Sequence, residues 1–209
     1  YIGTPAAISL RQSDKILMTS LANKVVHVNE KGSNYSGRQE LLNSINRMID
    51  GSIVEKENFD TVDLVYRSRN GKDIRLEDLA SGFKPLVYML RLIENGWLTE
   101  NTLLEIDEPE TNLHPQWVVE LAHLLVCINK TFGTKILITS HNPDMVSAIR
   151  YISEKEDLLN TTRFYLAEQS EGTDSFYYKN LGCDIEPVFE SFNKSFDTLQ
   201  KYVENYGEI

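Results

Sequence analysis

The sequence predicts an α/β fold built around a parallel sheet. Two short apolar strands, residues 103–107 and 135–139, are each followed by a segment with helical spacing of apolar residues. Strands that alternate with helices in this way pair in parallel through crossover helices. The chain has 209 residues, of which 41% are hydrophobic and 25% charged, so it can form one sizeable core.

Residues ahead of the first of these strands give local patterns of their own. Residues 23–28 read as a short strand, and residues 39–48 as a helix. Residues 60–67 and 72–76 alternate polar and apolar around an Asn-Gly pair at 70–71, which is typical of a tight hairpin. We therefore expect a strand, a helix and a hairpin in this region.

Three helices are predicted around the two parallel strands. The first begins near Phe83 and closes at Gly96, with Pro85 in its first turn, where a missing N–H costs little. The other two extend over about residues 115–129 and 143–150.

A second hairpin and a final helix are predicted after these. Residues 162–168 and 174–179 are expected to pair around a Glu-Gly turn. An apolar stripe then marks one face of a long helix, and consists of Ile185, Val188, Phe189, Phe192, Phe196, Leu199 and Val203. We expect this stripe to pack into the core rather than to form a groove for a partner.

Charge and composition exclude some classes of protein. The formal net charge is −10, from 21 basic and 31 acidic residues, which argues against broad contact with a phosphate backbone but leaves a local basic strip open. Cys127 and Cys183 lie outside metal-ligand spacing and predict reduced thiols in the cytoplasm. The most apolar stretch, 117–128, is interrupted by Glu120 and His123, so no membrane span is expected.

Two consecutive carboxylates, Asp107 and Glu108, stand at the carboxyl end of the first parallel strand, where α/β folds place ligands. The first carboxylate suits Mg²⁺, which keeps several waters and takes one or two carboxylates together with phosphate oxygens. The second would lie where it can polarise an attacking water. Taken alone, the pair fits an ordinary polar loop equally well.

Two further clusters favour a nucleotide site. Strand 135–139 ends in Ser140-His141, so a neighbouring parallel strand would bring an imidazole to the same sheet edge, within reach of a γ-phosphate or the attacking water. Ser81 and Gly82 precede a helix, and a helix N-terminus with free N–H groups suits an anion. Taken alone, Ser81 is better explained as an ordinary helix N-cap.

In order and spacing, the three clusters resemble those of ABC-type ATPases, and among them the SMC, RecF and overcoming-lysogenisation-defect branch. Residues 79–84 look like the signature motif, 103–108 like the Walker B strand, and His141 like the switch histidine. The run Asp-Glu-Pro-Glu-Thr-Asn-Leu-His-Pro is closer to that branch than to transporter ATPases. The resemblance implies a P-loop NTPase-like parallel sheet, with residues 1–209 forming a partial ABC-type ATPase domain that ends in a hairpin and helix.

The resemblance also implies a role for each site residue. Asp107 would hold Mg²⁺ through water, Glu108 would be the catalytic carboxylate, and His141 would sense the γ-phosphate. Ser81 and Gly82 would reach the nucleotide of a second subunit, because ABC dimers sandwich two ATP molecules head to tail. The implied function is ATP hydrolysis by an ATP-dependent homodimer in the cytoplasm, used in DNA maintenance or phage defence with DNA or a nuclease as partner.

The sequence departs from the family pattern in several places. Ala80 stands where the first serine of the signature motif is common, and His114 replaces the usual aspartate after the carboxylate pair. Glu105 places a charge in an otherwise apolar strand, and because burial of an unpaired charge is costly, we expect it to face a polar seam or to pair with a basic side chain. The phosphate-binding sequence Gly-x-x-x-x-Gly-Lys-Ser/Thr does not occur. Residues 32–39 imitate it with two glycines at the right spacing, but they lack the lysine that reaches the phosphates and the hydroxyl that binds Mg²⁺. Because the first residue is Tyr1, we expect the phosphate-binding loop upstream, and the isolated chain to bind ATP weakly or not at all.

Three other functions stay open. A non-hydrolysing module would only switch partner binding, although the retained pair Asp107 and Glu108 favours hydrolysis. A transporter ATPase subunit is disfavoured by Leu113-His114 and by the lack of a coupling-segment pattern. A metal-dependent nuclease would use the same pair with Glu110, but its carboxylates would have to hold metals about 4 Å apart.

Overall fold

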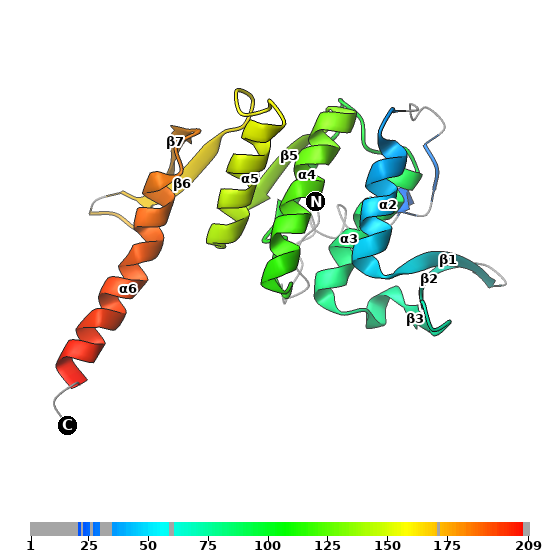
Figure 1. The fold of residues 1–209 in the computed structure, drawn as a ribbon, viewed down its shortest axis with the longest axis horizontal. Coiled ribbons are helices and arrows are strands. Elements are labelled where there is room, and N and C mark those ends of the chain that lie inside the picture. Colours follow the sequence, from blue (N-terminus) through cyan, green and yellow to red (C-terminus); the bar gives the residue numbers. More distant parts are fainter. Residues whose placement is uncertain are drawn as a thin grey trace. The chain divides into compact units, whose positions relative to one another are not determined.

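The computed structural model describes residues 21, 23–25, 27–29, 35–58, 61–170 and 172–206 (Figure 1). The chain divides into two compact units, residues 1–141 and 142–209. The first unit carries the parallel strands and all five predicted site residues. Within the described residues, no helix is long and apolar enough to cross a membrane.

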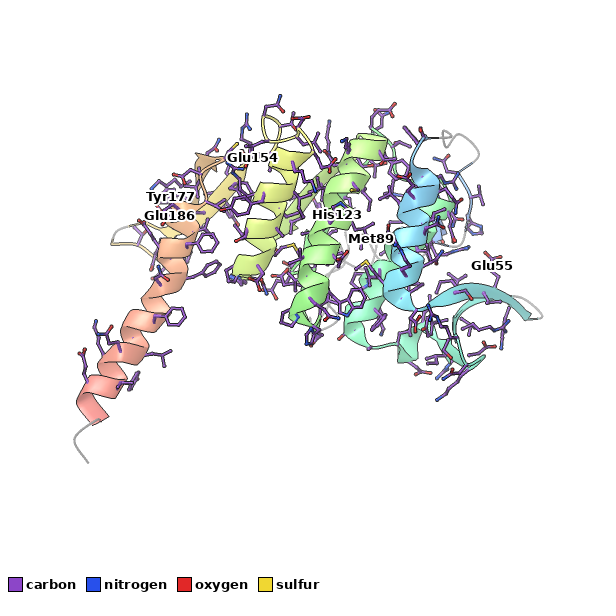
Figure 2. The ribbon with its side chains drawn as sticks, in the orientation of Figure 1. Glu55, Met89, His123, Glu154, Tyr177 and Glu186 are labelled. Atoms are coloured by element: carbon purple, nitrogen blue, oxygen red, sulfur yellow. The ribbon has the colours of Figure 1, made fainter. Side chains whose placement is uncertain are left out.

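Three helices form the core of the first unit: α2 (Arg38–Ile49), α3 (Lys84–Glu94) and α4 (Pro115–Phe132). Helix α2 contacts both α3 and α4. The side chains that they bury completely are aliphatic or methionine, and include Ile45, Ile49, Met89, Leu90, Ile93, Leu121, Leu125 and Ile128. Met89 of α3 is among the residues labelled in Figure 2. Full burial stabilises the fold by about 1.5–3 kcal/mol for each such side chain, so this apolar layer is the main support of the unit.

The parallel sheet consists of β4 (Leu103–Asp107) and β5 (Lys135–Thr139), and both strands were predicted with these bounds. One face carries the buried Leu104 and Ile106. The opposite face is open within the described structure, because Leu103 is 55% and Leu137 is 53% exposed. The two apolar strands are therefore covered on one face and exposed on the other. Glu105 pairs in register with Leu137 and lies on the same open face, so its charge is not enclosed in the core.

An antiparallel sheet of three strands precedes the helix that leads to β4. Its order is β1 (Gly51–Asn58), β2 (Thr61–Ser68) and β3 (Asp73–Arg75). The hairpin predicted at residues 70–71 joins β2 to β3, with Gly71 at φ 76°. Strand β1 was not predicted, because its sequence Gly-Ser-Ile-Val-Glu-Lys-Glu-Asn mixes charges into the apolar run.

The prediction of a strand over residues 23–28 is wrong. The described residues 23–25 are helical and 27–29 are irregular. Their backbone groups bond to the end of α3 instead of to a neighbouring strand. The Asn29 N–H donates to the carbonyl oxygen of Asn95 at 2.8 Å, and the Trp97 indole N–H donates to the carbonyl oxygen of His27 at 2.7 Å. Tertiary hydrogen bonds thus satisfy polar groups that a strand would pair with another strand.

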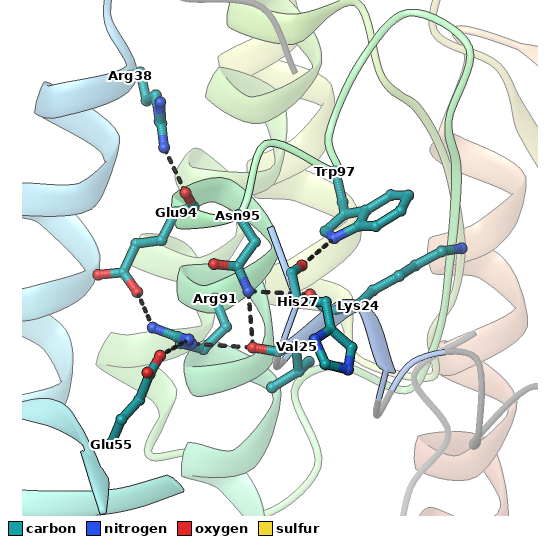
Figure 3. A network of polar contacts seen from close by, with 9 residues as sticks. All are labelled: Lys24, Val25, His27, Arg38, Glu55, Arg91, Glu94, Asn95 and Trp97. Carbon is teal, nitrogen blue, oxygen red and sulfur yellow. Dashed lines mark hydrogen bonds and ion pairs between the residues drawn. The ribbon is translucent and has the colours of Figure 1, made fainter. Parts of the chain in front are cut away.

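Arg91 of α3 is the centre of this junction (Figure 3). The residue is only 8% exposed, and its Nε donates to the carbonyl oxygen of Val25 at 3.1 Å. The guanidinium also pairs with Glu94, at 3.1 Å, and with Glu55 of β1. The side-chain amide of Asn95 donates to the same Val25 carbonyl at 2.8 Å. One buried cation therefore joins α3, β1 and the segment around Val25.

The second unit contains α5 (Pro143–Lys155), a hairpin of β6 (Phe164–Gln169) and β7 (Phe176–Gly182), and α6 (Glu186–Tyr206). All four were predicted from the sequence. Helix α5 is capped by the Asn142 side chain, whose oxygen accepts the N–H of Asp144 at 2.8 Å and of Met145 at 3.1 Å. The cap explains why the chain turns into a helix directly after His141.

The apolar stripe of α6 is buried or half-buried in its first half and exposed in its second half. Val188 is buried, and the rings of Phe189 and Phe192 meet edge to face with centroids 6.2 Å apart. Phe196 and Leu199, further along the helix, are exposed. The expectation that the whole stripe packs into the core is therefore wrong for its second half, because α6 extends past the hairpin (Figure 1).

Candidate nucleotide site

Asp107 and Thr139 meet at the carboxyl ends of the parallel strands. They are partners in the register of β4 and β5, and the Thr139 hydroxyl donates a hydrogen bond to Oδ1 of Asp107. The bond orients a partly exposed carboxylate at the strand end. No group of three or more His, Cys, Asp or Glu side chains in the described residues is placed to hold a metal. A single oriented carboxylate fits Mg²⁺ that is otherwise bound by waters and phosphate oxygens.

Glu108 contacts His141 across the same strand ends. Its Oε1 lies 3.4 Å from the imidazole Nε2, a contact that becomes an ion pair when His141 is protonated. Its Oε2 accepts a hydrogen bond from the Thr111 hydroxyl at 3.2 Å. The imidazole is 86% and the Glu108 carboxylate 40% exposed, so both can reach a ligand.

The backbone of Glu108 is held in an uncommon conformation. Its φ is 43°, in the left-handed region that non-glycine residues rarely adopt. Its N–H donates to the carbonyl oxygen of Thr139 at 3.0 Å, which ties the turn to the end of β5. Sparsely populated conformations cost about 1–3 kcal/mol and cluster at functional sites. This outlier therefore supports a functional role for the carboxylate.

Glu110 forms a second link between the two strand ends. Its Oε1 accepts a hydrogen bond from the Ser140 hydroxyl at 2.5 Å, while its Oε2 is buried. The sequence drew attention to Glu110 only as a ligand of the nuclease alternative. The structure instead bonds it to Ser140, the residue before His141, so Glu110 joins the ends of the two strands.

The turn that carries Ser81 and Gly82 lies against the turn that follows Glu108. Ser81–Phe83 is a single 3₁₀ turn that leads into α3, and the cap residue of α3 is Phe83, so Ser81 is not the ordinary N-cap considered above. Gly82 is buried, and a Cβ added to it would lie 2.8 Å from the carbonyl oxygen of Asn112. The structure thus brings the predicted anion turn next to the carboxylate turn of the same chain.

His114 has a structural role in this chain. It is the N-cap of α4, and its Nδ1 accepts the N–H of Gln116 at 3.4 Å. An aspartate would cap a helix at least as well, so the contact does not explain why a histidine stands where the family commonly has an aspartate.

The imitation of a phosphate loop over residues 32–39 is only partly described, since Gly32 lies outside the described residues. Arg38 stands where the loop would carry its lysine, and donates to the carbonyl oxygen of Glu94 at 2.6 Å. Tyr35 donates to Glu100 at 2.8 Å and packs edge to face on Phe132. These contacts give the described half of the run a structural role between helix ends.

Parallel strands that end in a carboxylate pair and a histidine, with a glycine turn against them, define the lobe of a P-loop ATPase. Residues 7–146 match the model of the AAA ATPase domain family, and the chain belongs to that family.

Two solved structures share the fold. One is an SMC ATPase described for its ATP-driven dimerization and DNA-stimulated activation, with a TM-score of 0.51, 11% identity, and 86% of this chain and 95% of that chain covered. The other is the Smc head domain with a coiled coil and joint from Pyrococcus yayanosii, with a TM-score of 0.55, 12% identity, and 88% and 31% covered.

Two curated relatives are similar in sequence. Septu protein PtuA of Bacillus thuringiensis is 33% identical over 101 residues, which are 43% of this chain and 25% of that protein. An uncharacterized ABC transporter ATP-binding protein of Methanocaldococcus jannaschii is 33% identical over 119 residues, or 55% of this chain and 20% of that protein. The predicted ATPase family is thus confirmed as that of the AAA ATPase domain, and the fold is shared with SMC heads. The chain spans a quarter or less of the length of these relatives.

Proposed function

We propose that this chain carries the hydrolytic part of an ATPase site, with Glu108 as the catalytic carboxylate. The observation that supports it is the contact between Glu108 Oε1 and His141 Nε2 at 3.4 Å, at an edge where Asp107 is also oriented. Bound Mg-ATP would supply the phosphoryl group and the cation that neutralises its charge. Asp107 would hold the cation through water.

Each side chain then has a defined task. Glu108 would accept a proton from the attacking water, and Thr111 would keep its carboxylate oriented through the 3.2 Å hydrogen bond. His141 would bond to the γ-phosphate or the water from the exposed side of the pair. These residues position the reactants and stabilise charge, and no covalent intermediate is needed. General base catalysis of this kind contributes typically about 10²–10⁴-fold.

We further propose that Ser81 and Gly82 act on the nucleotide of a second copy in an ATP-dependent homodimer. The SMC ATPase with the same fold is described as dimerizing under ATP, which supports such an arrangement here. A phosphate-binding loop outside this chain would complete each site, since Arg38 in the imitation loop is bonded to Glu94.

The work coupled to hydrolysis is proposed to be DNA maintenance or phage defence in the cytoplasm, with DNA or a nuclease as partner. The similarity to Septu protein PtuA and the DNA-stimulated SMC ATPases named above support this choice. The net charge of −10 argues against broad DNA contact by this chain and leaves contact through a local basic strip open.

The test is Glu108→Gln in the full-length protein, because the amide keeps the shape and removes the proton acceptor. Turnover of ATP should fall at least about 10²-fold, while nucleotide binding stays within a few-fold and ATP traps a dimer of doubled mass in light scattering. The control is Glu105→Gln, which removes an equal charge from the open face of β4 and should leave turnover unchanged.

Wild-type turnover in the Glu108→Gln protein would reject Glu108 as the catalytic carboxylate. If the wild-type protein binds ATP and changes its affinity for a partner but does not hydrolyse the ATP, the chain belongs to a non-hydrolysing regulatory module instead. That module is the second candidate function.

A further inference from the structure

Three consecutive residues, the last of β5 and the two after it, each contact a carboxylate at or just beyond the end of β4. The contacts join Thr139 to Asp107, Ser140 to Glu110, and His141 to Glu108. The reaction proposed above uses the carboxylates of the first and the last contact. Glu110, in the middle contact, takes no part in that reaction as proposed.

The Glu110 carboxylate is turned toward the protein rather than toward an open site. Its Oε1 accepts the Ser140 hydroxyl at 2.5 Å, a length typical of a hydroxyl bonded to a charged carboxylate. Its Oε2 is buried and has no hydrogen-bond partner among the described residues. Because burial of a charged oxygen without a partner is costly, the bond to Ser140 matters all the more to this carboxylate. With one oxygen closed to solvent and the other bonded, Glu110 is poorly placed to bind a metal or a nucleotide.

The position of His141 depends on its backbone. The imidazole is 86% exposed, so packing does little to fix it, and its contact with Glu108 is 3.4 Å long. Ser140 is the residue directly before it, and follows the strand that pairs with β4. A hydrogen bond that holds Ser140 therefore restricts the backbone from which the imidazole projects.

We infer that Glu110 is a positioning residue for the proposed ATPase reaction. By accepting the Ser140 hydroxyl it fixes the turn after β5, and this keeps the His141 imidazole opposite Glu108. Glu110 itself contacts neither the nucleotide nor the attacking water. The inference rests on the proposed function, because His141 needs a fixed position only if it acts on a γ-phosphate or on that water. A misplacement of about 1 Å can cost about 10²-fold in rate, so such a residue matters to turnover.

The experiment is a double-mutant cycle on ATP turnover by the full-length protein. Glu110→Ala removes the acceptor, Ser140→Ala removes the donor, and the double variant removes both. Each single variant should lower kcat about tenfold and leave KM within about twofold, since positioning acts on the chemical step rather than on binding. The double variant should turn over no more slowly than the slower single variant, because both changes break the same bond.

Two further serine variants serve as controls. Ser140→Thr keeps a hydroxyl at the same position and should retain most of kcat. Ser44→Ala removes a hydroxyl that donates to the carbonyl oxygen of Glu40 at 3.0 Å, within α2, and should leave both kinetic constants unchanged.

Amide hydrogen exchange, followed by mass spectrometry, detects the same bond without ATP turnover. Peptides that cover residues 139–142 should exchange at least about threefold faster in Glu110→Ala and in Ser140→Ala than in the wild-type protein, because the turn opens more often. They should exchange at the wild-type rate in Ser44→Ala.

An additive loss of about a hundredfold in the double variant would overturn the inference, because the two residues would then act independently. So would wild-type kcat in Glu110→Ala, or a raised KM with unchanged kcat, which would make Glu110 part of nucleotide binding. If Glu108→Gln stops turnover and Glu110→Ala does not, the positioning role fails and the proposed function stands. If Glu108→Gln retains turnover, the proposed function fails and the positioning role fails with it.

Discussion

The carbonyl oxygen of Asn112 lies 2.8 Å from the point where a Cβ at Gly82 would stand, and the Leu113 side chain lies 3.0 Å from the same point. Real side chains do not approach a backbone oxygen so closely. Only glycine therefore lets the signature-like turn pack against the turn that follows the carboxylate pair. The two turns are consequently linked within one chain, before any second copy contributes.

Gly82→Ala should separate the two turns. We expect a loss of about 1–3 kcal/mol in the free energy of unfolding, as for other overpacked sites, and a fall in ATP turnover with nucleotide binding retained. Chemical denaturation and a turnover assay on the full-length protein measure the two effects. Ser81→Ala is the control, because it removes the neighbouring hydroxyl and adds no atom. An unchanged denaturation midpoint in Gly82→Ala would show that the turns can shift freely.

Ser81→Arg should block closure of the dimer by filling the anion turn with a bulky cation, while each copy still binds ATP. Mixing Ser81→Arg subunits with Asp107→Asn subunits gives the sharper test. If Ser81 acts in trans, each mixed dimer has one site with both lesions and one with neither, so up to about half of the activity returns. Single-turnover hydrolysis by a purified mixed dimer is the measurement. No hydrolysis at the intact site would contradict action in trans.

Glu110→Ala should disturb the site through Ser140, whose hydroxyl donates to Glu110 at 2.5 Å. Removal of the acceptor costs about 1–3 kcal/mol, and the freed Ser140 should let His141 move, so turnover falls. Glu110→Gln keeps an acceptor oxygen and should restore most of the activity. The same pair of variants tests the nuclease alternative, in which Glu110→Gln would abolish metal-dependent DNA cleavage instead.

Arg91→Met should destabilise the first unit, because it removes the donor that joins Val25, Glu94 and Glu55 around α3. We expect a loss of about 1–3 kcal/mol in the free energy of unfolding. Arg67→Met is the control, since the Arg67 side chain is 44% exposed, against 10% for Arg91, and the loss of its ion pair with Asp73 should cost less. Urea unfolding followed by circular dichroism compares the two. Equal midpoints would mean that the buried junction adds nothing.

Local patterns predicted most elements of this chain. Strands β4 and β5 were predicted with their observed bounds, because a short apolar run between turn residues is typical of a buried strand in an α/β fold. The prediction over 23–28 failed because hydrogen bonds to Asn95 and Trp97, far away in sequence, decide its conformation. The pattern of α6 was identified correctly as a helix, but burial of Phe196 depends on what lies beside it.

The sequence by itself determined the chemical types and their order: a glycine turn, a carboxylate pair and a histidine, each at the end of a strand or the start of a helix. Only the tertiary structure decided that Glu108 faces His141, that Gly82 touches Asn112, and that Glu110 holds Ser140. The physical reason is the range of the forces involved. Helix and strand periodicity is read from neighbours along the chain, whereas a contact of about 3 Å between distant residues depends on how whole elements pack.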